Sequence, residues 1–330
     1  MNFLILSSGR RTKLIEYFVK EFKGFGNIIV TDCDPLAPTL YIADKGYIVP
    51  RIDDANYINE IKEICKKENI NGLISLIDPE LSLISKYEKI FNEIGVKCFL
   101  SKYDVTEICF DKYKMFKFLE NNSFKTAKSF IDFKEFKEEY ENGKIKFPVF
   151  IKPICGSASI NINKINTLSE VEFLMNKYEG LIIQEFLDGQ ELGIDVYTDM
   201  LTGEVISIFA KEKIRMRSGE TDKSKSIKCE KLFSIIESFV KKLGTRGPID
   251  IDVFRIEGEY YISEVNPRFG GGHPHAYECG ENFMKFIQNN LVDIENKVQI
   301  GNYEDDVYMI KHDTLNIIRH SDMEKLQSIK

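Results

Sequence analysis

The chain has 330 residues, of which 43% are hydrophobic and 29% charged, an ordinary composition for a globular protein of two or three domains. Its net charge of −7 disfavours general nucleic-acid binding, which requires a basic surface. The sequence contains no apolar run of about 18 residues, so it predicts no membrane-spanning helix. Its seven cysteines are scattered and form no CxxC pairs, which indicates free thiols in the cytoplasm rather than disulfides or a zinc site.

About the first hundred residues alternate short apolar segments with amphipathic ones. Continuous apolar runs are typical of buried parallel strands, and the segments between them show helical spacing. We expect strands at 3–6, 28–31, 47–49, 73–76 and 96–99, and helices at 12–23, 57–68 and 80–94. This pattern predicts a doubly wound α/β domain with its ligand crevice at the carboxyl ends of the strands.

Charged residues follow three of these strands. Arg10, at a helix start, is expected to hold an anion, and Asp78 or Glu80 to hold an amine or hydroxyl of a substrate. The alternative, that these are ordinary loop and helix-capping residues, is equally open. The first loop lacks GxGxxG, so a dinucleotide-binding site is not supported.

The segment 102–122 predicts one polar helix that carries Lys112, and 127–130 and 133–142 predict a strand and a charged helix. An apolar strand then ends in Lys152, before a loop of small residues, 156–159, and a second strand at 160–162. Small residues allow backbone N–H groups to close over phosphate oxygens while a lysine supplies charge. The open alternatives are a surface role for Lys112 and an ordinary flexible hairpin; a P-loop is disfavoured, because GxxxxGK[ST] is absent.

A purine-binding segment is expected next. After a helix at 168–178, the apolar run 181–187 contains Glu185-Phe186-Leu187, which offers main-chain groups and apolar walls to a purine edge. Glu191 opens the following strand and is expected to hold ribose hydroxyls.

Residues 247–272 predict a β-hairpin that turns at Glu257-Gly258 and carries acidic residues on one face. A two-residue loop would set Asp252 opposite Ser263, whereas a three- or five-residue loop sets Asp252 opposite Glu264 and Asp250 opposite Asn266. We expect the second register. Crowded carboxylates favour a hard cation such as Mg²⁺ over the alternative of a solvated acidic face. Arg268, a bidentate donor, and glycines at 270–272 follow at once and suit phosphate.

Taken in order, these motifs resemble the ATP-grasp superfamily of ATP-dependent ligases. The motifs are Asp-Lys112, FPVFIK152P with its Gly/Ser loop, QEFLDGQE191, and Asp252 with E264VN266PR268. The last stretch is most similar to that of carbamoyl-phosphate synthetase large subunits and biotin carboxylases. The resemblance implies an α/β and α+β fold: a doubly wound pre-grasp domain at 1–104, followed by a two-subdomain ATP-grasp fold with a small lid subdomain at 105–187 and a large subdomain at 188–330.

The resemblance also implies a role for each motif residue. Lys112 and Lys152 would contact ATP phosphates under a flexible loop. The segment Glu185-Phe186-Leu187, called the hinge segment below, would hold adenine, and Glu191 would hold the ribose. Two Mg²⁺ ions, with Mn²⁺ as a substitute, would bind three side chains, and Arg268 would steady an acyl phosphate. The nucleotide set is Lys112, Lys152, Gly156, Ser157, Ser159, Glu185, Phe186, Leu187 and Glu191, and the metal set is Asp252, Glu264 and Asn266.

The charged segment 211–221 lies where this family places groups near the γ-phosphate, so we expect a loop in which Arg215 and Arg217 contact anions. A mobile charged loop is the alternative. Substrate contacts are expected where Arg10, Glu80, Arg217 and the 270–275 loop converge, which adds Gly271 and His273. A structural role in the turn is equally open for His273 and His275.

These features predict an ATP- and Mg²⁺-dependent carboxylate–amine ligase that acts through an acyl phosphate. Its partners would be a small carboxylate and an amine, without nucleic acid or membrane, in a cytoplasmic homodimer. The chain has a single unit of this type and no glutaminase-like or biotin-carrier segment, which puts carbamoyl-phosphate synthesis in doubt. The alternatives are a carboxylase or phosphotransferase that makes carboxyphosphate or carbamoyl-phosphate-like products, and a non-catalytic nucleotide-binding regulator.

Overall fold

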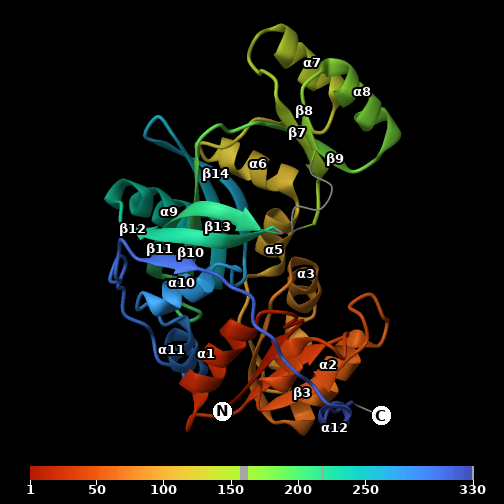
Figure 1. Ribbon diagram of the computed structural model, residues 1–330, viewed down its shortest axis with the longest axis vertical. Coiled ribbons are helices and arrows are strands. Elements are labelled where there is room, and N and C mark those ends of the chain that lie inside the picture. The colour runs from red at the N-terminus through yellow and green to blue at the C-terminus, as the bar shows by residue number, and fades with distance from the viewer. Residues whose placement is uncertain (157–162, 218, 329–330) are drawn as a thin grey trace.

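The computed structural model describes residues 1–156, 163–217 and 219–328. These residues form three β-sheets of five, six and four strands. In Figure 1 the five-stranded sheet lies at the bottom, the six-stranded sheet in the middle and the four-stranded sheet at the top. This is the mixed α/β and α+β architecture that the sequence predicts.

The N-terminal sheet is parallel, with strand order β3-β2-β1-β4-β5. Each expected strand is present, because the apolar runs are buried on both faces of the sheet, as in parallel sheets generally. The expected helix at 80–94 is instead two helices, α3 and α4, separated at Tyr87. The elements are β1 Asn2–Leu6, α1 Thr12–Phe22, β2 Ile28–Asp32, the 3₁₀ turn Pro38–Tyr41, β3 Lys45–Ile48, α2 Tyr57–Lys67, β4 Ile70–Ser75, α3 Asp78–Lys86, α4 Glu88–Asn92 and β5 Lys97–Cys98.

The single helix expected at 102–122 is wrong. It is divided into α5, Tyr103–Phe110, and α6, Lys112–Asn121. Asp111 causes the break, since its side chain accepts hydrogen bonds from the backbone N–H groups of Tyr113 (2.9 Å) and Lys114 (3.0 Å) and so caps α6. Both helices contribute apolar side chains to the core of the six-stranded sheet.

The four-stranded sheet, in the order β6-β9-β7-β8, carries helices α7 and α8 and encloses a small core of its own. The predicted strand at 160–162, together with Ser157 and Ser159, lies outside the described residues; β8 begins at Asn163. The elements are β6 Ser129–Phe130, α7 Phe133–Glu141, β7 Val149–Pro153, β8 Asn163–Ile165, α8 Leu168–Lys177 and β9 Leu181–Glu185. The expected division of the chain at 104 and 187 stays a prediction.

The six-stranded sheet is antiparallel, in the order β14-β13-β10-β11-β12-β15. The loop expected at 211–221 is wrong, because β11 and β12 extend through most of it as one long hairpin. The elements are β10 Gln190–Thr198, β11 Val205–Arg217, β12 Glu220–Ile227, α9 Glu230–Leu243, β13 Gly247–Ile256, β14 Glu259–Asn266, α10 His273–Glu278, α11 Phe283–Leu291, β15 Tyr308–Ile310 and α12 His320–Met323.

The β13–β14 hairpin has the expected pairing but reaches it differently. Its loop is the two-residue turn Glu257-Gly258, with both φ angles positive (51° and 79°). A β-bulge at Ser263 then shifts the register by one residue, so that Asp252 pairs with Glu264. The expectation of a longer loop was wrong, whereas the pairing that it was meant to explain is confirmed.

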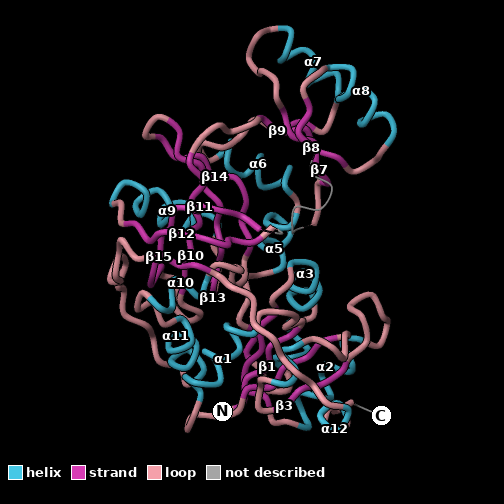
Figure 2. The backbone as a smooth tube through the Cα atoms, viewed as in Figure 1, coloured by secondary structure: helices cyan, strands magenta, loops and turns pink. Residues whose placement is uncertain are grey.

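The C-terminal segment returns to the N-terminal sheet after β15, and Figure 2 shows it as a long loop that ends at α12. Gln327 pairs in parallel with Tyr47 of β3, and hydrogen bonds from Ile48 N–H (2.9 Å) and to Gly46 C=O (3.1 Å) flank this bridge. The segment therefore ties the large sheet to the first domain. Among the helices of the described chain, none has the length and apolar character to cross a membrane.

Candidate active site

One face of the six-stranded sheet collects acidic side chains from three adjacent strands. Across β10, β13 and β14, Gly193, Asp252 and Glu264 form one row, and Asp195, Asp250 and Asn266 form the next. Residues directly opposite one another in a sheet share a face, so both rows project to the same side.

Two buried lysines of β11 neutralise part of this face. The Nζ of Lys213 lies 2.5 Å from Asp252 Oδ1 and 2.7 Å from Glu191 Oε1, and the Nζ of Lys211 contacts Asp195. Both lysines pass over Gly193, where a Cβ atom would lie 3.0 Å from Lys211 Cε and 3.1 Å from Lys213 Cε. The glycine therefore gives both side chains room to reach the carboxylates.

The acidic face still carries surplus negative charge. Burial, followed by the neighbouring Asp252, raises the pKa of Asp250 to about 6. Burial also raises the pKa of Asp252, although Lys213 opposes this shift. A divalent cation would relieve the repulsion, and two carboxylates with an amide oxygen suit Mg²⁺ when substrate phosphates complete the shell.

The predicted metal-binding residues fit this chemistry. Asp252 and Glu264 are paired directly, and Asn266 follows on the same strand face. In the described parts of the chain, no three His, Cys, Asp or Glu side chains gather as a metal site by themselves. Asp252, Glu264 and Asn266 would therefore share the coordination shell of the metal with oxygens of water or of a bound phosphate.

Lys152, the last lysine of the small sheet before the Gly/Ser loop, is buried on β7. Burial lowers its pKa, whereas the charges of Glu264 and Asp252 act to raise it. Lys112 lies close by, and its Nζ donates to the Gly156 carbonyl (2.6 Å). The two predicted phosphate-binding lysines thus come together near the acidic face of the other sheet.

The hinge segment after β9 offers an apolar wall. Phe186 packs against Phe150 of β7, with ring centroids 5.5 Å apart, while Leu187 is buried. The Glu185 carboxylate points away from the Phe186 ring and accepts a hydrogen bond from the backbone N–H of Lys128 (3.1 Å). An adenine contact would therefore use the Glu185 main chain, as the sequence analysis expects, and it stays a prediction.

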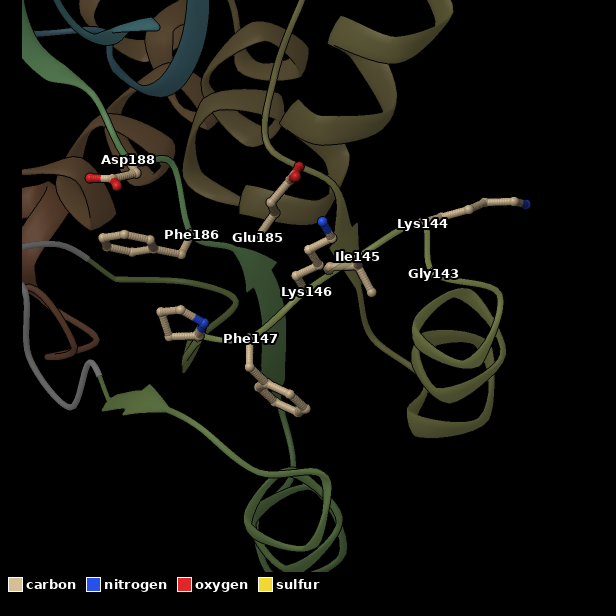
Figure 3. Close-up of a pocket in the computed structure, with 9 residues that line it drawn as sticks. Gly143, Lys144, Ile145, Lys146, Phe147, Glu185, Phe186 and Asp188 are labelled. Atoms are coloured by element: carbon tan, nitrogen blue, oxygen red, sulfur yellow. The ribbon is translucent and has the colours of Figure 1, made fainter.

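A cavity of about 400 Å³ lies beside this hinge (Figure 3). Phe186 and Asp188 stand at one side of it, across from the loop 143–148.

Gln184, which the sequence analysis did not select, pairs with Phe150 and lies on the same face of the small sheet as Lys152. The alternation of β9 is the signal that would have identified it.

Arg268 lies at the junction between the acidic face and the first domain. Its Nε and Nη2 donate to Asp78 Oδ2, at 3.2 and 2.9 Å, and its Nη1 donates to the Phe269 carbonyl (3.1 Å). Arg11 donates to the same carbonyl, and burial together with the nearby Arg268 lowers the pKa of Arg11 to about 10. The neighbouring Arg10 is exposed.

Glu80 is wholly buried, and its two oxygens already accept hydrogen bonds from three hydroxyl groups. The donors are Ser7, Ser75 and Tyr57. These bonds fix the start of α3 against β1 and β4. The substrate contact expected for Glu80 stays a prediction.

The other residues predicted to contact substrate or anions belong to β11 and to the loop after β14. Arg215 and Arg217 are exposed near the tip of the β11–β12 hairpin, facing Asp222 (3.9 Å) and Asp313 (3.2 Å). A Cβ atom at Gly271 would lie 3.0 Å from Glu220 Cδ, so this glycine permits close approach of the hairpin. The contacts of Arg215, Arg217 and Gly271 with ligands stay predictions.

The two histidines after the glycines are core residues in the structure. His273 is fully buried with Nδ1 3.3 Å from Asp195 Oδ1, and His275 Nδ1 lies 2.8 Å from Ser224 Oγ. Burial lowers the pKa of His275 to about 4, so it is neutral at physiological pH. These contacts support the structural alternative for His275, whereas His273 Nε2 has no partner within the described residues and the substrate contact of His273 stays a prediction.

Comparison with known proteins gives matches along most of the chain. Residues 3–99 match the PylC-like N-terminal domain, and residues 109–272 match the ATP-grasp domain. The chain is 25% identical over 304 residues to the carbamoyl phosphate synthase large chain of Clostridium botulinum (strain Loch Maree / Type A3); the match covers 86% of this chain and 27% of that protein. The chain thus spans about a quarter of the length of that relative.

Solved structures share the fold. The biotin carboxylase domain of Hydrogenobacter thermophilus 2-oxoglutarate carboxylase, solved with MgADP, ADP and bicarbonate, superposes with a TM-score of 0.74 at 15% identity, over 93% of this chain and 73% of that one. The L-amino acid ligase of Bacillus licheniformis gives a TM-score of 0.67 at 19% identity, over 90% of this chain and 75% of that one.

Proposed function

Since the chain belongs to the ATP-grasp family, we propose that it is an ATP- and Mg²⁺-dependent ligase that joins a small-molecule carboxylate to an amine through an acyl phosphate. ADP and phosphate would be the other products. We also propose a cytoplasmic location, consistent with seven free cysteines, and a homodimeric assembly.

One observation carries this proposal. Lys152 of the small sheet is close enough to Glu264 and Asp252 of the large sheet for their charges to act on its pKa. A buried ammonium group of one sheet therefore lies near a carboxylate pair of another, and a metal-bound triphosphate would fit between such groups.

The residues have distinct tasks in the proposed reaction. Lys112 and Lys152 would hold the phosphates, and Asp252, Glu264 and Asn266 would hold Mg²⁺, which would supply positive charge to offset that of the phosphates. Arg268 would donate to the acyl phosphate, and Asp78 would fix the guanidinium through its two hydrogen bonds. The protein's contribution is alignment and electrostatic stabilisation, because phosphoryl transfer needs little covalent help.

The decisive experiment is a pooled screen of amino acids and small acids with the whole protein, which reads ADP release and product mass. We expect ADP release to require a carboxylate and an amine together with Mg²⁺, and the product mass to equal their condensation by loss of water. ADP release that depends on bicarbonate alone would overturn the proposal in favour of a carboxylase. A protein that binds ATP without releasing ADP in any pool would overturn it in favour of a regulator.

A further inference from the structure

The sequence leaves Asp78 and Glu80 as two candidates for holding a substrate amine, and the structure separates them. Both oxygens of Glu80 accept hydrogen bonds from protein hydroxyls. In Asp78, Oδ2 accepts both hydrogen bonds from Arg268, whereas Oδ1 is shielded from solvent and has no hydrogen-bond donor within the described residues. Among the described residues, Asp78 therefore has an oxygen with no donor at all, whereas both oxygens of Glu80 are engaged.

A second polar atom close to Asp78 is also unpartnered. The Oγ of Ser82 is shielded from solvent, and nothing in the described parts of the chain bonds to it. Ser82 follows Asp78 by four residues on α3, so the two side chains lie one turn apart on one helix face. The next serine of the helix, Ser85, differs, because it bonds to Thr106 Oγ1 and to the Ser82 carbonyl, both at 3.0 Å.

Two neighbouring buried polar atoms without partners are unusual, since buried polar groups are normally hydrogen-bonded. Their position points to a ligand. The helix α3 begins at the carboxyl end of β4, where doubly wound domains bind their ligands, and Figure 1 places it directly beneath α5 at the junction of the first domain with the large sheet. Arg268 reaches Asp78 from the far side of this junction.

We propose that Asp78 and Ser82 bind the primary ammonium group of the amine substrate. Its later role as the nucleophile rests on the function proposed above: the nitrogen first gives a proton to Asp78 Oδ1 and then attacks the acyl carbon as phosphate leaves. An ammonium group has three N–H donors and no acceptor, which matches a carboxylate oxygen and a hydroxyl oxygen. Its positive charge suits Asp78, which shares its negative charge with one guanidinium group. A carboxylate or phosphate oxygen, in contrast, has no hydrogen to donate to Asp78 Oδ1.

This subsite also explains the pairing of Asp78 with Arg268. The carboxylate accepts from the guanidinium group through Oδ2, and no described residue donates to Oδ1, so an amine bound to Oδ1 would lie beside the residue predicted to hold the acyl phosphate. Holding two reactants next to each other is a large part of what such an enzyme must supply.

The test measures binding without turnover. Thermal unfolding of the whole protein is followed with Mg²⁺ and a non-hydrolysable ATP analogue, against a panel of the common amino acids and simple alkylamines. Ser82→Ala removes one hydroxyl and no contact to Arg268, and Ser85→Ala is the matched control on the same helix. Asp78→Asn removes the charge.

We expect at least one primary amine to raise the melting temperature of the wild type and of Ser85→Ala at the same concentrations, and its N-acetylated form to have no effect. Ser82→Ala should need at least about 10-fold more amine, the loss for one hydrogen bond to a charged group. Asp78→Asn should need more still. The inference is overturned if Ser82→Ala responds as Ser85→Ala does, or if no primary amine stabilises the wild type.

The two proposals fail separately. ADP release with condensation products in both wild type and Ser82→Ala, at equal KM for the amine, would overturn the amine subsite and leave the ligase function. A wild type that is stabilised by an amine through Ser82 yet releases no ADP would leave the subsite and overturn the ligase function.

Discussion

Replacing Lys213 by Met tests whether the buried lysine holds the acidic face together. The side chain is 5% exposed and bonds both Asp252 and Glu191. Removing one partner of a buried ion pair costs about 3–5 kcal/mol, because the remaining charge is left uncompensated. The two carboxylate side chains keep exposures of 22% and 29%, so water offsets part of the loss. We therefore expect the lower end, about 3 kcal/mol.

The assay is thermal unfolding without divalent metal. At roughly 2 °C per kcal/mol for a chain of this size, Lys213→Met should melt about 6 °C below the wild type. The control is Lys231→Met, which removes an exposed ion pair to Glu259 and should cost under about 1 kcal/mol. Equal melting temperatures for the two variants would refute the reasoning.

Adding MgCl₂ gives a second readout of the same variant. In Lys213→Met no ammonium group competes with Mg²⁺ for Asp252. Mg²⁺ should therefore raise the melting temperature of Lys213→Met by more degrees than it raises that of the wild type. A larger gain in the wild type would show that Lys213 does not occupy the place of a cation.

Three further changes address the site and its support. Asp252→Asn should lower turnover by about 100-fold, because metal stabilisation is worth several kcal/mol, with the loss partly recovered at high Mn²⁺; wild-type activity would remove Asp252 from the metal site. Gly193→Ala should destabilise the protein by about 2 kcal/mol, since its Cβ would meet both lysines at 3.0 and 3.1 Å; an unchanged melting temperature would contradict the close packing. Burial raises the pKa of the wholly buried Glu281 from 4.5 to about 7. The folded state therefore binds more protons than the unfolded state between these values, and stability falls as pH rises through this window. Glu281→Gln should match the wild type near pH 4.5 and exceed it by about 3 kcal/mol at pH 8, measured as melting temperature against pH.

The sequence predicts the layers of this protein well where local patterns decide them. The apolar strands of the first domain, the resemblance to the ATP-grasp family and the pairing of Asp252 with Glu264 are all confirmed. The sequence analysis derives this pairing from a longer loop, however, whereas in the structure a bulge at Ser263 produces it. Nothing local distinguishes a bulge from a longer loop, because both insert one residue and give the same alternation beyond it.

The sequence does not reveal which charged side chains are buried. Lys211 and Lys213 make β11 resemble a charged loop, since an isolated lysine is normally solvated. Their burial depends on partners that are distant in sequence: Asp195 and Glu191 on β10 and Asp252 on β13, reached across the gap at Gly193. The same holds for Arg268, whose partner Asp78 lies 190 residues earlier in another domain. Such pairs become visible only once strand order is known. The order β13-β10-β11 places each lysine one or two strands from its carboxylate partner. Because of this order, β11, which looks like a surface segment in the sequence, lies at the centre of the candidate site.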